Sequence, residues 1–217
     1  MNHIAVRRRP VAAAQVALVG CALFVALLAL LHLVRPEIDP SWHFISEYAI
    51  GENGWLMGLA FFSLALGYLA LAVALAPHLR GLGGRVGLAL LAAGAVGLGL
   101  AGLFPMDPLM THPDDATTSG TLHHVGGTLG IALPLAALVV SWKLARDPDW
   151  RAHRRRIAWA GIAAVVASAA SMVALGAMLS ESSGQFGPDV PVGWPNRLEI
   201  LAGCAWLAVV ARARSRR

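Results

Sequence analysis

The chain has 217 residues, of which 57% are hydrophobic and only 13% are charged, and its formal net charge is +5 at pH 7. Soluble domains carry about 25% charged residues, so this composition excludes an ordinary soluble domain and indicates an integral membrane protein. The same values exclude an intrinsically disordered chain, which would be rich in charge and poor in apolar residues.

Six apolar runs are long enough to cross a membrane, because about 20 residues at 1.5 Å each cover roughly 30 Å of hydrocarbon. They predict an all-α bundle of six transmembrane helices and, with no long segment between them, a single integral membrane domain over residues 1–217. The first run is too long for a signal peptide, so we expect an uncleaved anchor. The expected spans lie near residues 11–34, 55–77, 86–104, 122–142, 157–179 and 194–211.

The basic residues predict the orientation of this bundle, because Lys and Arg accumulate in short cytoplasmic segments. If both termini are cytoplasmic, 15 of the 17 Lys and Arg residues lie inside and ten of the 12 acids lie outside. We therefore expect a multi-pass plasma-membrane protein with cytoplasmic N- and C-termini. The basic clusters then lie beside anionic headgroups, so membrane lipids are the expected partners and nucleic acids are not.

Small residues are dense in the third and fifth runs, where Gly, Ala and Ser recur at four-residue spacing. Such spacing lets helix backbones approach closely, so both spans are expected to be central packing elements. The middles of the runs hold almost no ionisable residue, whereas five of the eight histidines lie on the external side. Any chemical site is therefore expected at the outer rim.

The first external loop predicts a short interfacial helix of about three turns. Asp39 is placed to cap it, Pro40 suits its first position, and Gly51 would end it. The polar face of this helix would present His43, Ser46 and Glu47 to a cleft; alternatively, these side chains are solvated or cap neighbouring helix ends.

Two further candidates lie around the second external loop. Asp107 stands between two prolines, in a turn that would fix its carboxylate as a metal ligand, as a proton acceptor for a histidine, or as a helix cap. His123 opens the fourth run, and we expect it, rather than His124, to face the bundle. His123 with Asp107 or Glu47 could then do acid–base work, or bind a divalent metal ion that activates water, in which case His123 and Asp107 are the predicted metal ligands.

The outer turn of the sixth run carries Asn196, Arg197 and Glu199, which implies that protein or headgroups shield this end. A planar guanidinium suits phosphate or carboxylate, so Arg197 is the expected contact for an anionic headgroup. Alternatively, Arg197 forms a structural ion pair with Glu47 or Glu199.

Several short motifs lie along residues 16–210: SEYA at 46–49 before GW at 54–55, FPMD at 104–107, LH at 122–123, SES at 180–182 and the NR pair at 196–197. Together they resemble an uncharacterised bacterial family of multi-pass membrane proteins, the domain of unknown function 998. The resemblance implies six spans and an external set of Ser, Glu, Asp, His and Arg side chains. It implies no particular reaction.

Three functions remain open, and whether the protein is an enzyme stays open with them. The first is an outer-leaflet pocket that binds or processes a lipid or another amphiphile, the second is a non-catalytic partner or assembly protein, and the third is a haem or quinone redox protein. Haem would need His32 opposite His123 or His124. For the first function, the candidate catalytic residues are Ser46, Glu47, Asp107 and His123, and the candidate ligand-binding residues are Tyr48, Asn196, Arg197 and Glu199.

Overall fold

The computed structural model describes residues 2–215, with residues 2–9 and 113 described by their backbone alone, and every regular element in that range is a helix. The α-helices are α1 (Asn2–Val34), α2 (Trp55–Leu75), α3 (Gly81–Leu103), α4 (Thr118–Gly130), α5 (Ala132–Arg146), α6 (Arg154–Glu181) and α7 (Gly193–Ser215). Three short 3-10 helices, η1 (Ile45–Ala49), η2 (Pro113–Asp115) and η3 (Pro148–Trp150), lie in the connections.

All six expected runs are helical, but the fourth is divided into α4 and α5 at Ile131. Pro134 has no N–H to donate to the carbonyl of Gly130 four residues earlier, and its ring crowds that carbonyl, which explains the break. The two halves together remain one stretch long and apolar enough to cross a membrane, Thr118–Arg146.

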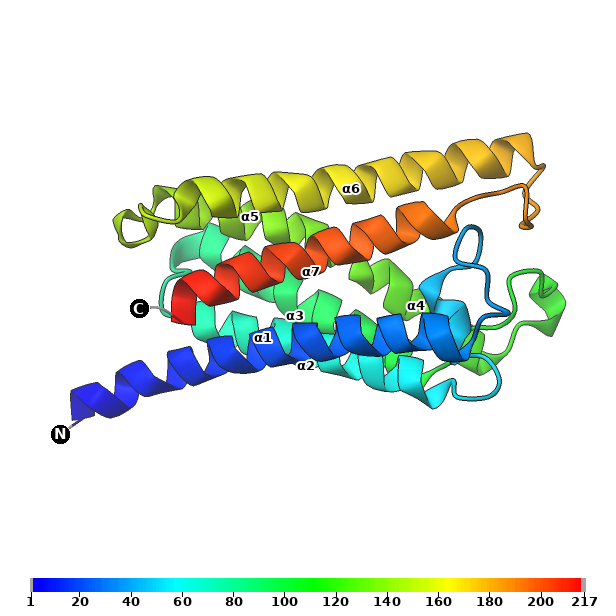
Figure 1. The fold of residues 1–217 in the computed structure, drawn as a ribbon. Helices are drawn as coiled ribbons and strands as arrows, with labels where there is room; N and C mark the ends of the chain where they lie inside the picture. The colour runs from blue at the N-terminus through cyan, green and yellow to red at the C-terminus, as the bar shows by residue number, and fades with distance from the viewer. Residues whose placement is uncertain (1, 216–217) are drawn as a thin grey trace.

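Five stretches of the described chain have the length and apolarity of membrane spans: Pro10–Val34, Trp55–Leu75, Gly81–Leu103, Thr118–Arg146 and Arg154–Glu181. Helix α7 is of similar length, but Arg197, Glu199 and its basic last turn interrupt its apolar stretch. The helices run along a common axis, and the start of α1 lies at the same end of the bundle as the end of α7 (Figure 1).

The small residues of α3 do mark a central packing element. Helix α3 packs against α2, α4 and α5, and a Cβ atom on Gly97 would lie only 2.5 Å from the carbonyl oxygen of Gly126 in α4.

The expectation that α6 is also a central packing element is wrong. Helix α6 packs against α5 and α7 at the edge of the bundle (Figure 1), and its outward side chains, such as Trp159 and Val173, are exposed. Small residues permit a close approach to one or two neighbours without requiring a central position.

The expected three-turn helix in the first external loop is also wrong, because only the five residues of η1 are helical. The carboxylate of Asp39 accepts hydrogen bonds from the backbone N–H and the hydroxyl of Ser41, at 2.8 and 2.7 Å. Asp39 therefore does cap one turn, in which its carbonyl oxygen accepts from the N–H of His43 at 3.1 Å, but the extended backbone of Phe44 (ψ 153°) ends that turn. Helical structure starts later, where the N–H of Phe44 donates to Oε2 of Glu47 at 2.9 Å.

Candidate functional site

The structure divides the sequence-predicted site residues among three places. The first is a network around Arg197, where α1, the first external loop and α7 meet. The second is the N-terminus of α4, which holds Asp107 and His123. The third is a cavity inside the bundle, which Glu199 lines.

Arg197 lies in the first turns of α7 and is only 3% exposed. Its Nε donates to Nε2 of His32 at 2.9 Å, and its Nη1 donates to the carbonyl oxygens of His43 and Gly193, at 2.7 and 3.1 Å. Its Nη2 lies 3.5 Å from the hydroxyl of Tyr48. The guanidinium therefore ties together α1, η1 with its flanking loop, and α7.

None of these partners is a carboxylate. Within residues 10–215, no Asp or Glu oxygen forms an ion pair with Arg197, so the expected pairing with Glu47 or Glu199 is wrong. Glu47 is buried and instead accepts from Phe44 N and lies 2.9 Å from Nδ1 of His43. The buried cation is held by neutral acceptors, which leaves it little capacity to bind an anionic headgroup.

Two more predicted residues belong to the same network. Oδ1 of Asn196 accepts from the N–H of Ile45 at 3.1 Å and so caps η1 from α7. Tyr48 is completely buried, and this burial raises the pKa of its phenol, which therefore stays protonated beside Arg197. Ser46 is half-buried on η1.

Arg35 holds the first external loop in place, although it was not among the predicted site residues. Its Nη1 donates to the carbonyl oxygens of Ile50 and Glu52, at 2.9 and 2.6 Å, and so fixes the chain after η1. A signal was present, since Arg35 and Arg197 are the two cations that the predicted topology leaves outside. Both are buried against this loop.

The second place is the N-terminus of α4. Asp107 accepts from the N–H and the hydroxyl of Thr117, at 2.9 and 2.7 Å, and Thr117 in turn caps α4 by accepting from Gly120 N at 3.0 Å. The hydrogen bonds from Thr117 hold the pKa of the Asp107 carboxyl below its ordinary value. Asp107 is therefore part of a helix cap, one of the three roles expected for it.

His123, and not His124, faces the bundle, as predicted: His123 is buried and His124 is exposed. Its Nδ1 lies 2.8 Å from the carbonyl oxygen of Phe104. His123 and Asp107 thus have separate hydrogen-bond partners, and a metal ion shared between them stays a prediction.

The haem alternative would use His32 as an iron ligand. Its Nε2 atom already accepts a hydrogen bond from Arg197, so haem ligation through Nε2 would break that bond.

The third place is a partly open cavity of about 50 Å³ lined by residues of α2, α3, α4, α5, α6 and α7. Oε1 of Glu199 accepts from the hydroxyl of Ser168 at 2.8 Å, at the wall of this cavity. Ser168 lies halfway along α6, so the carboxylate reaches the middle of the bundle. The expectation of a Glu199 at the outer rim, with almost nothing ionisable at mid-depth, is therefore wrong.

The rest of the cavity wall is mainly apolar, and two aromatic rings contribute to it. Tyr68 and Trp206 stack at 6.5 Å between ring centroids, with an interplanar angle of 22°. Gly130 and Pro134, which flank the helix break, line the same space. Gly130 and Pro134 are visible in the sequence and could have predicted the break. No periodicity of the sequence indicated that Ser168 would meet Glu199. Chemically, the site offers a hydrogen-bond acceptor in an apolar chamber.

The chain matches the sequence model of a protein family. Neither a curated protein nor a solved structure gives a significant match to the chain. The sequence model of a family described as "Protein of unknown function (DUF998)" matches residues 18–213, which is nearly the whole chain and agrees with the resemblance found in the short motifs. The chain therefore belongs to the DUF998 family of proteins of unknown function.

Proposed function

We propose that the protein is a six-span plasma-membrane protein that binds a small amphiphile in the cavity beside Glu199, through a cationic or hydrogen-bond-donating head group on that ligand. In this proposal both termini are cytoplasmic, and the loop that contains η1 lies at the level of the outer headgroups. The single observation that carries the ligand class is the Glu199 carboxylate at the wall of a mainly apolar cavity in the middle of the bundle.

The six-span arrangement is supported by the position of α7 and by the tryptophans. Helix α7 packs between α1 and α6, and its only buried cation near the outer end, Arg197, is covered by protein acceptors. Exposed tryptophans lie near the two ends of the bundle, Trp55 and Trp194 at one and Trp142 and Trp159 at the other. Tryptophans concentrate at both membrane–water interfaces, so these residues are consistent with two aromatic belts.

The ligand class follows from the charge that each site can accept. A carboxylate in an apolar chamber attracts a donor or a cation and repels another anion. Ionisable groups at mid-membrane depth are costly, and those that occur usually serve a function. The anionic-headgroup alternative is less well supported, because three donors of Arg197 already contact His32, His43 and Gly193.

We propose binding rather than catalysis, because the expected catalytic residues do not share hydrogen bonds. Glu47 contacts His43, Asp107 contacts Thr117, and His123 contacts Phe104. A general acid–base site would place such groups within hydrogen-bond reach of one another or of a common substrate atom.

Hexylamine, hexanol and hexanoate, which share one chain and differ in the head group, test this function with the protein in nanodiscs. We expect tryptophan fluorescence, with Trp206 in the cavity wall, to report the tightest binding for hexylamine and the weakest for hexanoate. Hydrogen bonds to charged groups contribute about 1.5–3 kcal/mol, so Glu199→Gln should weaken hexylamine binding about tenfold or more.

The matched control is Glu181→Gln, at the exposed end of α6, which should bind hexylamine like the wild type. Thermal unfolding of each variant without ligand shows whether the fold is intact. If a folded Glu199→Gln variant binds hexylamine as tightly as the wild type, the cavity is not the site. A non-catalytic partner protein then becomes the better description.

A further inference from the structure

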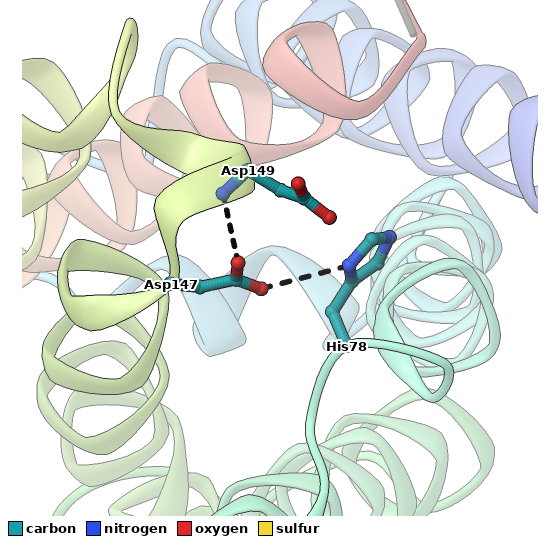
Figure 2. Close-up of side chains that lie close together, drawn as sticks. All are labelled: His78, Asp147 and Asp149. Carbon is teal, nitrogen blue, oxygen red and sulfur yellow. Dashed lines mark hydrogen bonds and ion pairs between the residues drawn. The ribbon is translucent and has the colours of Figure 1, made fainter.

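We propose that His78, Asp147 and Asp149 form a binding site for one divalent first-row metal ion at the end of the bundle where α1 begins and α7 ends. His78 lies in the connection between α2 and α3, and the two aspartates flank Pro148 between α5 and α6. One potential ligand atom from each side chain lies within 4.8 Å of the others. Figure 2 shows the imidazole and both carboxylates approaching one another from the two connections.

One hydrogen bond within the set and one ring contact outside it orient two of these groups. Oδ1 of Asp147 accepts from the N–H of Asp149 at 2.9 Å, which leaves Oδ2 directed at Nδ1 of His78, 3.7 Å away. The ring of His78 meets the buried ring of Trp150 edge-on, at 5.5 Å and 89°. Metal sites commonly depend on such surrounding contacts to hold their ligands in position.

Helix capping explains only part of the arrangement. Asp147 is the N-cap of η3, and Pro148 suits the position that follows it. Capping does not account for the carboxylate of Asp149 or for the imidazole of His78, which both face the same small space (Figure 2). These are also the two acids that the predicted topology leaves on the strongly basic side of the membrane. Together they supply a local charge of −2, which matches a divalent cation.

The ligand atoms determine the class of metal ion. One imidazole nitrogen with two carboxylate oxygens suits Zn²⁺, Mn²⁺ or a similar transition-metal ion, whereas Mg²⁺ and Ca²⁺ favour oxygen ligands alone. A bound ion would cross-link the α2–α3 and α5–α6 connections. It would therefore raise the unfolding temperature, by an amount that grows with the logarithm of the ion concentration divided by its Kd, because it binds the folded chain and not the separated loops.

The test uses the full-length, tag-free protein in detergent after chelator treatment, titrated with ZnCl₂ and, separately, with MgCl₂. We expect calorimetry to give one Zn²⁺ per chain, weak or no Mg²⁺ binding, and a rise in unfolding temperature with Zn²⁺. His78→Ala and Asp149→Asn should each weaken Zn²⁺ binding about 10-fold or more, while leaving the metal-free unfolding temperature near that of the wild type.

The matched control is His112→Ala, which removes the histidine of an exposed His–Asp pair, 3.4 Å from Asp114, at the other end of the bundle. This variant should bind Zn²⁺ like the wild type. The proposal is overturned if wild-type protein binds no Zn²⁺ or if His78→Ala binds it as tightly as His112→Ala does. It is equally overturned if Mg²⁺ binds as tightly as Zn²⁺.

Discussion

Nε of Arg197 donates a hydrogen bond to Nε2 of His32 across 2.9 Å, although the two residues are 165 positions apart in the chain. A guanidinium is always protonated, so Nε2 of His32 must be the acceptor and its Nδ1 must carry the proton. This Nδ1–H donates a hydrogen bond to the carbonyl oxygen of Leu28, 2.7 Å away. The contact therefore assigns a neutral tautomer to His32 and joins the end of α1 to the beginning of α7.

Arg197→Ala should be strongly destabilising, because it leaves His32 Nε2 and the carbonyl oxygen of His43 without their donor. Each buried acceptor left unsatisfied costs about 1–3 kcal/mol. We expect the free energy of unfolding to fall by about 3 kcal/mol or more, measured by thermal unfolding in detergent. Arg197→Lys should recover less than half of this loss, since an ammonium lacks the planar fork. Arg85→Ala, at an exposed position, is the control and should change little.

A charge exchange between Arg197 and Glu47 should not rescue stability. The double variant Arg197→Glu with Glu47→Arg would restore an ion pair if one existed, but Arg197 contacts neutral acceptors and Glu47 contacts His43 and Phe44. We expect the double variant to unfold at or below the temperature of the less stable single variant. A double variant as stable as the wild type would contradict the hydrogen bonds described for Arg197.

Gly97 and Gly99 on α3 offer a matched pair for the packing of the bundle. A Cβ atom on Gly97 would lie 2.5 Å from Gly126 O and 3.0 Å from Gly130 N, whereas a Cβ atom on Gly99 would meet nothing within 4 Å. Gly97→Ala should therefore lower the free energy of unfolding by about 1–3 kcal/mol through overpacking. Gly99→Ala should be neutral or stabilising by about 0.5–1 kcal/mol. Equal unfolding temperatures for the two variants would show that α3 and α4 are not in this close contact.

The Asp107–Thr117 cap predicts a pH dependence of stability. The folded-state pKa of Asp107 lies below its ordinary value of 3.8, because Thr117 donates two hydrogen bonds to the carboxylate. A depressed carboxyl pKa contributes stability above the unfolded-state pKa, and this contribution is lost as the pH falls through the folded-state pKa. Unfolding temperatures measured from pH 7 to pH 2 should therefore show an acid-induced loss below about pH 4. Asp107→Asn should lack this component, and an unchanged acid profile in that variant would count against the cap.

The orientation of the bundle is testable by cysteine labelling. In a background with Cys21→Ala and Cys204→Ala, the variants Gln185→Cys and Arg151→Cys place single exposed thiols in loops at opposite ends of α6. A membrane-impermeant maleimide should label Gln185→Cys on intact cells and Arg151→Cys only after permeabilisation, because basic loops remain in the cytoplasm. Labelling of Arg151→Cys alone on intact cells would reverse the proposed topology.

The sequence by itself determined the helical architecture. Hydropathy is a local property, and backbone groups in hydrocarbon must be satisfied within their own helix, so each apolar run predicts a helix almost independently of the others. The expected run at 157–179 is therefore recovered as Arg154–Glu181, and the run at 55–77 as Trp55–Leu75. The expectation that His123 rather than His124 faces the bundle is confirmed, although no local signal distinguished the two, and the sequence implied a shielded environment for Arg197.

Only the tertiary structure decided which polar groups meet. The contacts of Arg197 with His32 and of Glu199 with Ser168 depend on how far each helix is rotated and displaced against its neighbours. Hydropathy does not encode those quantities, because every face of an apolar helix has similar transfer free energy. For the same reason Glu199 was expected at the rim and lies at mid-depth. The approach of His78 to Asp147 joins two loops that no sequence motif connects.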